Sequence, residues 1–162
     1  MKKSRVFKQE RHQIFKEKPK DPYRSNQKLQ EPTVCSECGA LFANGRWCWQ
    51  RVPDNNVNQT LCPACQRITD NYPAGFIELG GDFFREHYDE IINLVKNTGE
   101  QEENQHPLER IIKITKRDGK TLITTTGLHI ARRIGDAIFN SYQGSLEYNY
   151  AAKHLIRVNW QR

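Results

Sequence analysis

The stretch ERIIKITKRDGKTLITTTGLHIARRIGDAIFNSYQG, residues 109–144, decides the fold class. Two runs rich in β-branched residues flank Arg117-Asp118-Gly119-Lys120, and Asp-Gly between such runs is a strong hairpin signal. A helix is expected next, because apolar residues recur there at helical spacing and Gly144 is placed to end it. These apolar residues are Ile130, Ile134, Ala137, Ile138 and Tyr142. The stretch therefore predicts two strands and a helix in succession.

The flanking sequence extends this pattern in both directions. Residues 145–150 (SLEYNY) and 154–160 (HLIRVNW) alternate apolar and polar side chains, which predicts two more strands. Upstream, Asp82 is placed as the N-cap of a helix that ends near residues 97–99, and residues 100–105 are expected to form a loop. Residues 73–81 are expected to form a Pro/Gly connector with room for one short strand. We therefore predict an α+β domain over residues 73–162, an antiparallel sheet packed with helices in the order α-β-β-α-β-β.

Two Cys-x-x-Cys pairs, Cys35/Cys38 and Cys62/Cys65, precede this domain. Each pair can form a tight knuckle that directs two thiolates to one metal, so the pairs predict one structural Zn²⁺ held by four cysteines. A hairpin between two knuckles is a zinc ribbon, which we place at residues 32–72. A segment this short has little core, so its folding should depend on the metal. A redox dithiol and an iron–sulfur site are the alternatives.

The segment between the pairs contains a fifth cysteine, Cys48, flanked by Trp47 and Trp49. Four thiols already fill a zinc site, so we interpret Cys48 as a half-buried residue and not as a ligand. The tryptophans either close the small core of the ribbon or, with Arg46 and Arg51, form a surface that stacks on bases or on a protein. The five histidines show no ligand spacing, and we expect them at the surface or in packing positions. They are His12, His87, His106, His129 and His154.

Positive charge is concentrated at the N-terminus. Residues 1–30 hold 10 of the 25 Lys and Arg but only 3 of the 19 Asp and Glu, so the remainder of the chain is close to neutral. With few large apolar residues, residues 1–31 are expected to form a flexible basic arm that contacts RNA phosphates. The arm's cations are Lys2, Lys3, Arg5, Lys8, Arg11, Lys16, Lys18, Lys20, Arg24 and Lys28. Arg132 and Arg133 on the predicted second helix are further candidate RNA contacts.

Several function classes are disfavoured. No apolar run approaches the roughly 20 residues that span a bilayer, and no apolar segment follows the basic start, so we expect a cytoplasmic protein. Gly119-Lys120-Thr121 matches the end of a phosphate-binding loop, but that motif needs a glycine where this chain has Ile114. The hairpin turn accounts for the tripeptide, and we expect neither an enzyme nor a small-molecule substrate.

Five runs of the chain resemble an uncharacterised family of small bacterial zinc-ribbon proteins, some of whose members are labelled ATPases. The runs are residues 31–50, 61–79, 106–111 (HPLERI), 124–138 (TTTGLHIARRIGDAI) and 157–162 (RVNWQR). The segment 124–137 is also weakly similar to the N-terminal half of the large-ribosomal-subunit export adaptor. The resemblance implies zinc at Cys35, Cys38, Cys62 and Cys65, and association with ribosomal RNA or the ribosome.

From these observations we expect a non-enzymatic, zinc-containing RNA-binding factor that acts on the ribosome in assembly, hibernation or stress, with ribosomal proteins as further candidate partners. The alternative is a zinc module that binds a polypeptide through Trp47 and Trp49. A nucleotide-dependent enzyme is a third and weaker hypothesis.

Overall fold

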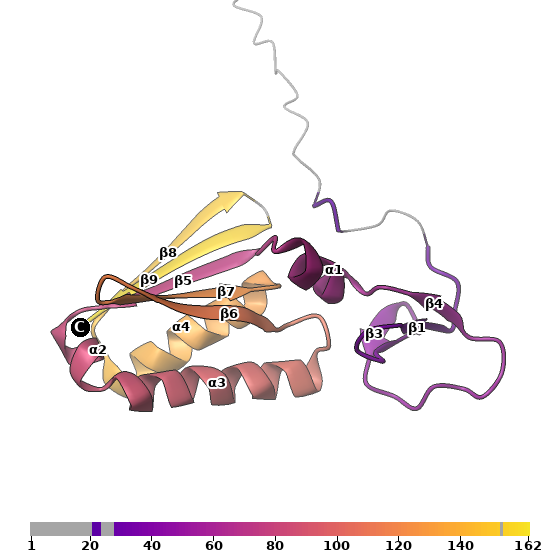
Figure 1. The fold of residues 1–162 in the computed structure, drawn as a ribbon, viewed down its shortest axis with the longest axis horizontal. Coiled ribbons are helices and arrows are strands. Elements are labelled where there is room, and N and C mark those ends of the chain that lie inside the picture. The colour runs from indigo at the N-terminus through magenta and orange to yellow at the C-terminus, as the bar shows by residue number, and fades with distance from the viewer. Residues whose placement is uncertain (1–20, 24–27, 153) are drawn as a thin grey trace, which may run out of the picture.

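The computed structural model describes residues 21–23, 28–152 and 154–162, which fold around two β-sheets. The smaller sheet belongs to the cysteine-rich segment, and the larger one to the C-terminal half of the chain (Figure 1). Helices pack on the larger sheet, so the predicted α+β class is confirmed.

The smaller sheet has four short strands in the order β3-β2-β1-β4. Strand β1 pairs antiparallel with β2 and parallel with β4. Asn44 and Gly45 form the turn between β2 and β3. Both have positive φ, as a two-residue type I′ hairpin turn requires. The bounds are β1 Thr33–Cys35, β2 Leu41–Ala43, β3 Arg46–Cys48 and β4 Asn58–Thr60, followed by helix α1, Pro63–Asp70.

The larger sheet has five strands in the order β6-β7-β5-β9-β8. Strand β5 lies at its centre, antiparallel to β7 and parallel to β9. Two hairpins, β6–β7 and β8–β9, extend the sheet on either side of it. The bounds are β5 Gly75–Gly80, β6 Ile111–Arg117, β7 Lys120–Thr125, β8 Ser145–Ala152 and β9 Leu155–Gln161.

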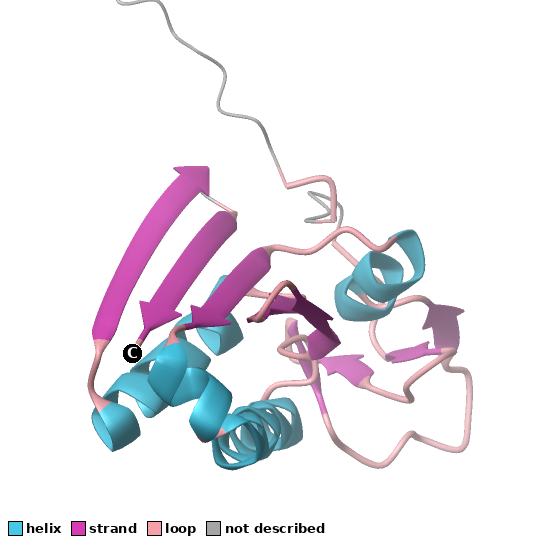
Figure 2. Cartoon of the chain, turned by 60° about the vertical axis from the view of Figure 1, so that its left-hand side comes forward, coloured by secondary structure: helices cyan, strands magenta, loops and turns pink. Residues whose placement is uncertain are grey.

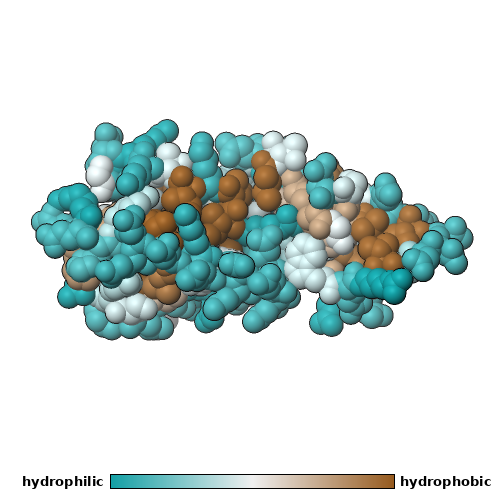
Figure 3. Space-filling view, turned by 60° about the horizontal axis from the view of Figure 1, so that its bottom comes forward, coloured by the Kyte–Doolittle hydropathy of each residue, from teal (hydrophilic) through white to brown (hydrophobic). Residues whose placement is uncertain are grey.

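Three helices cover one face of this sheet (Figures 1 and 2). They are α2 (Asp82–Glu86), α3 (Tyr88–Gln105) and α4 (Leu128–Tyr142). The core lies between them and the sheet, where Ile77, Val158 and Trp160 from the strands pack with Ile91 and Ile134 from the helices. Seen from the helix side, the surface is mostly hydrophilic (Figure 3). Hydrophobic side chains gather in two groups, one on the larger unit (the five-stranded sheet with its helices) and one on the cysteine module (residues 32–72).

The predicted connector at residues 73–81 holds one strand, as the sequence allowed, but this strand is the centre of the sheet. Because it pairs parallel with β9, the prediction of an antiparallel sheet was wrong. Its partner β9 lies about 80 residues further along the chain, and the pair is parallel. Glycines at both ends of the segment suggested a linker. Gly75 is required by packing instead, because a Cβ there would lie 2.7 Å from the Cβ of Ala131 on α4.

The predicted end of the upstream helix near residues 97–99 was also wrong, because α3 continues to Gln105. Gly99 does not end the helix but lets Ile111 of β6 approach it closely: an added Cβ would lie 2.5 Å from Ile111 Cδ1. The predicted loop at residues 100–105 is therefore the last part of α3, and it includes a buried carboxylate, Glu102. The predicted N-cap Asp82 is the first residue of α2, with Gly81 at the cap.

The β6–β7 hairpin, helix α4 and strands β8 and β9 lie where the sequence predicted them. Asp118 and Gly119 turn the chain between β6 and β7 with φ of 46° and 75°. Gly144 follows the end of α4 with φ of 95°. These elements depend on local turn chemistry and on residues close in sequence.

Most of the predicted basic arm lies outside the described residues. Where it is described, Asp21 and Tyr23 contact the cysteine module. The Arg67 guanidinium of α1 donates to Asp21 Oδ1 at 2.7 Å and stacks 4.5 Å from the centroid of the Tyr23 ring. Arg67 is buried, so the carboxylate of Asp21 balances its charge. Residues 21–23 are thus fixed to α1.

The packing of β5 against α4 gives a test of the central strand. We expect Gly75→Ala to lower the free energy of unfolding by about 1–3 kcal/mol, because the added methyl group overpacks the space beside Thr125 and Ala131. Gly80→Ala, in the same strand, is the matched control, since its new Cβ would meet only the flexible Lys120 side chain at 3.4 Å. Urea unfolding followed by circular dichroism measures both. Equal losses in the two variants would contradict the role given to Gly75.

Candidate metal centre

The first cysteine pair lies in a knuckle between β1 and β2. Cys35 ends β1, its carbonyl accepts the Gly39 N–H at 3.0 Å, and its own N–H donates to Ala40 O at 2.8 Å. Gly39 has φ of 77°, a conformation that favours glycine. The turn places Cys38 beside Cys35, as the sequence predicted for this pair.

The second pair lies at the N-terminus of helix α1. Cys62 is the N-cap residue, and its Sγ accepts the backbone N–H of Cys65 at 3.4 Å. Pro63 occupies the first turn, where its missing N–H leaves no bond unmade. The module thus runs knuckle, hairpin, helix, and the partial positive charge at the helix N-terminus favours thiolates there.

The sulfur atoms of the four cysteines lie close together. Their Sγ atoms all lie within 4.8 Å of one another, and Cys38 Sγ is 3.8 Å from Cys62 Sγ. A tetrahedral Zn²⁺ with bonds of about 2.3 Å would separate its sulfur ligands by roughly 3.8 Å, so the cluster fits such an ion. Cys35, Cys62 and Cys65 are buried, and Cys38 is half-buried. The four cysteines could therefore hold a metal ion such as zinc.

An arginine from outside the module completes the cluster. Arg110 precedes β6, and its guanidinium donates to the Sγ atoms of Cys38 at 3.0 Å, Cys65 at 3.4 Å and Cys62 at 3.5 Å. Burial opposes its charge, but hydrogen bonds to the sulfurs of Cys65 and Cys38 raise the pKa of Arg110 above its usual value. A four-thiolate zinc centre carries a net charge of about −2, and a buried cation beside it lowers the cost of that charge.

The backbone around Arg110 is held in place by the larger unit. Its N–H donates to Thr126 Oγ1 at 2.8 Å, and the Thr126 N–H donates to Arg110 O at 2.9 Å. Its Nε also donates to Pro107 O at 2.7 Å, and Leu108 packs against the cysteine cluster. Sequence reasoning missed this residue, because nothing local distinguishes Arg110 from a surface cation at the start of a strand.

The thiols differ in their ease of ionisation. Burial opposes ionisation of Cys35, but backbone N–H groups, led by that of Cys38, lower its pKa to about 6. Burial raises the pKa of Cys62, and it raises that of Cys65 against the effect of Arg110. A metal binds the thiolate forms, so metal binding releases protons and weakens as pH falls.

The residues between the pairs mostly make contacts within the chain. Cys48 is half-buried, and its Sγ lies 3.3 Å from Leu41 O and outside the four-sulfur cluster. Trp47 packs against that cluster and lies 5.5 Å from the ring of Phe42. Trp49 donates its Nε1–H to Glu103 O at the C-terminal end of α3, 2.6 Å away. Trp49 thus links the module to α3, Trp47 packs on the module's own cluster, and a partner for either stays a prediction.

Among the described residues, the predicted cations do not form one patch. Arg46 is exposed on β3, and exposed Arg51 lies 3.9 Å from Asp54. On α4, Arg132 points to the β8 tyrosines, with Nη1 3.4 Å from Tyr150 Oη. Arg133 donates to Glu102 at 2.9 Å. Lys28 is exposed, and the other predicted arm cations lie outside the described residues.

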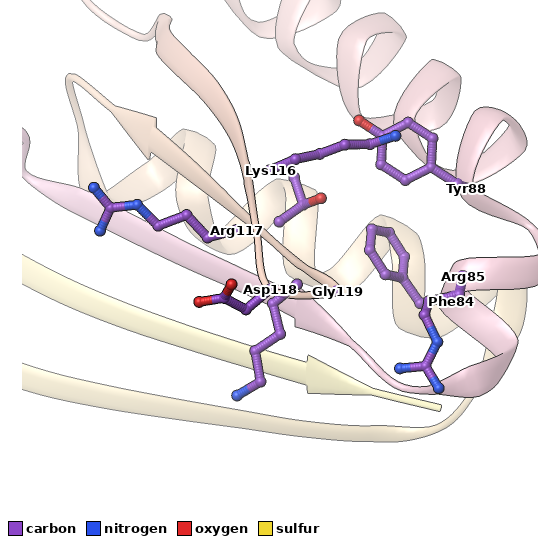
Figure 4. A pocket seen from close by; sticks show the side chains of 9 residues that line it. Phe84, Arg85, Tyr88, Lys116, Arg117, Asp118 and Gly119 are labelled. Atoms are coloured by element: carbon purple, nitrogen blue, oxygen red, sulfur yellow. The ribbon is translucent and has the colours of Figure 1, made fainter.

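A cavity of about 300 Å³ lies between the β6–β7 turn and helices α2 and α3. Figure 4 shows Lys116 alongside the Tyr88 ring, where its Nζ is 3.5 Å from the ring centroid. Gly119-Lys120-Thr121 forms the turn and the start of β7, as the sequence predicted, and no helix follows it. The geometry of a nucleotide-binding phosphate loop is therefore not formed by these residues.

No family model, curated protein or solved structure matched this chain. Within the described residues, the helices are too short or too polar to cross a membrane.

The ligand set predicts how cysteine substitutions change metal content. Cys48→Ser should leave about one metal ion per chain, because four other sulfurs fill a tetrahedral site, whereas Cys62→Ser should lose most of it. Elemental analysis of protein purified with zinc in the growth medium measures both. Loss of metal from the Cys48→Ser variant would show that the ligand set is wrong.

The Arg110 contacts predict a weaker site when the guanidinium is removed. Arg110→Met should lower metal affinity about 10- to 100-fold, as expected when an outer partner of metal ligands is lost. Competition with a chromophoric chelator gives the affinity. Arg117→Met, at the exposed end of β6, is the control and should change the affinity less than about twofold. Equal affinity in the Arg110 and Arg117 variants would contradict the role of Arg110.

Proposed function

We propose that this chain is a non-enzymatic RNA-binding protein, with one structural Zn²⁺ at the four cysteines. The observation that carries the proposal is the uncovered face of the five-stranded sheet. Helices α2, α3 and α4 lie on the other face, and in the described part of the chain α1 lies only near one end of the sheet (Figures 1 and 2).

A row of side chains across the uncovered face combines cations with an aromatic ring. The strand registers align Lys113 of β6, Thr124 of β7, Phe76 of β5, Arg157 of β9 and Asn149 of β8. Phe76 is half-buried in the central strand, and the Arg157 guanidinium stacks 4.8 Å from the centroid of its ring. A flat sheet with an aromatic ring at its centre and cations beside it is a common platform for unpaired RNA bases.

Charges on the neighbouring rows suit a polyanion. Arg117 and Lys120 pair across the β6–β7 turn at one end of this face. The acidic residues there are Glu78, which accepts a hydrogen bond from Lys120 Nζ at 2.6 Å, and Glu147 at the edge. Lys113, Arg117 and Arg157 have no salt bridge among the described residues, so they are free to bind phosphates.

Residues 21–23 of the predicted arm lie near the opposite end of the sheet, where β5 begins. Tyr23 packs on Tyr72 with ring centroids 5.7 Å apart, and Tyr72 lies three residues before Gly75, the first residue of β5. The Phe76 row lies at that end of β5 as well. The arm would bind phosphates on either side of a base stacked on Phe76.

The role proposed for zinc is structural. Four thiolates fill a tetrahedral coordination shell, and no position remains for a substrate or a reactive water. The ion's contribution is to fold the module, which holds α1 and the attached arm in place. A ribosomal target for the RNA-binding face is the partner that the sequence resemblance implies.

Binding of the protein to a fluorescent single-stranded RNA tests this proposal. Phe76→Ala should weaken binding by about 1–3 kcal/mol, the contribution of one stacked base, or roughly 5- to 150-fold. Lys113→Gln and Arg157→Gln should each reduce the slope of log affinity against log salt by about 0.7, one phosphate contact. Pelleting with purified ribosomal subunits, with and without residues 1–20, tests the ribosomal target.

Lys96→Gln is the matched control, because Lys96 is equally exposed but lies on α3, on the opposite side of the sheet. Its RNA affinity and salt slope should equal those of the wild type. No binding to RNA, or equal effects of Lys96→Gln and Lys113→Gln, would refute the proposal for this face.

A further inference from the structure

We infer that the chain has a second metal site, formed by Glu102, His106 and His129. One ligand atom from each of these residues lies within 4.8 Å of those from the other two. No ligand spacing of the histidines is visible in the sequence, because His129 lies on α4, far along the chain from Glu102 and His106. The site takes a divalent transition metal ion.

The ends of two helices bring the three side chains together. Glu102 lies in the last turn of α3, and His106 is the residue that caps its C-terminal end and donates its N–H to Glu102 O. His129 is the second residue of α4, and its ring lies 5.9 Å from that of His106 in an edge-to-face arrangement. Both rings are exposed, so an ion can enter from solvent.

The Glu102 carboxylate provides the independent indication of a ligand. Its side chain is only 7% exposed, and among the described residues the buried Oε2 has no hydrogen-bond partner. His129 Nε2 lies 3.0 Å from this oxygen, an ion-pair distance when the imidazole is protonated. Two ligands bound to one ion at about 2.0–2.2 Å lie about 3.0–3.5 Å apart, so this close approach suits a shared cation.

The other carboxylate oxygen of Glu102 is already fixed. Arg133 Nε donates to Oε1 at 2.9 Å, which orients the carboxylate with Oε2 toward the histidines. Metal-binding carboxylates commonly have such an outer partner. Glu109 is a further carboxylate at the start of α4, where its Oε2 accepts the Ile130 N–H at 3.0 Å.

The ligand set indicates which metals fit. Two imidazoles and one carboxylate suit Zn²⁺, Co²⁺, Ni²⁺ or Fe²⁺, and they leave coordination positions for water. The cysteine centre, with four sulfurs, takes a softer ion in a filled shell. The two sites therefore differ in ligand chemistry and can be distinguished by spectroscopy.

The test is a Co²⁺ titration of the full chain whose cysteine site is already loaded with Zn²⁺. We expect one further equivalent to bind, with nitrogen and oxygen ligand-field bands and no sulfur charge-transfer band. His106→Ala and His129→Ala should each weaken this second binding at least tenfold. In nitrogen-detected NMR, the ring signals of His106 and His129 should shift or broaden as the ion binds.

His87→Ala is the control, because His87 precedes α3 at its other end, about 28 Å from His106 along the helix axis. It should bind the second ion like the wild type. His106 and His129 are exposed, so their variants should stay folded, and circular dichroism checks this. The proposal is wrong if the wild-type chain binds no second equivalent of Co²⁺. It is also wrong if the His106→Ala and His129→Ala variants bind the second equivalent as tightly as the wild type, and Glu102 is then an ion-pair partner only.

Discussion

The contact between Arg110 and the cysteine sulfurs determines how the two parts of this protein are joined. A four-thiolate metal centre carries excess negative charge, and three of its four sulfurs lie in buried residues. Buried charge is costly unless a partner balances it, and within the described residues that partner comes from the other sheet. The cysteine module is thus complete only when it is docked on the larger unit.

The same contact fixes the surfaces that carry the proposed functions. Thr126 holds the backbone of Arg110, so the guanidinium, the start of β6 and the entry to α4 are set together. Lys113 follows three residues after Arg110 on β6, and His129 follows three residues after Thr126 on α4. Trp49 adds a second link by donating to the C-terminal end of α3. These contacts link the cysteine module to the strand and helices that carry the sheet face and the histidine pair.

The sequence predicted what is encoded locally and missed what depends on distant contacts. The Asp118-Gly119 turn, α4 and the first cysteine knuckle depend on residues close in sequence, and all three were predicted. The parallel pairing of β5 with β9 joins distant segments, so the Gly-bounded strand β5 seemed to be a connector. Gly99 indicated a helix end because its packing partner, Ile111, could not be known from the sequence. Arg110 and the Glu102–His106–His129 cluster were missed for the same reason.

Attraction to RNA cannot come from the net charge of the folded part, because residues 31–162 hold 15 basic and 16 acidic residues. The proposed attraction to RNA therefore requires that the basic and the acidic side chains lie on different faces of the protein. The exposed face of the sheet carries Lys113, Arg117 and Arg157, while exposed acidic residues such as Asp89, Glu90 and Glu100 lie on α3 behind the sheet. A polyanion near this face meets cations at short range, and the opposing charges lie farther away and are screened over about 8–10 Å at physiological salt. The sheet thus separates a face that attracts a polyanion from a face that repels it. This arrangement gives the nearly neutral residues 31–162 one face suited to the proposed RNA binding.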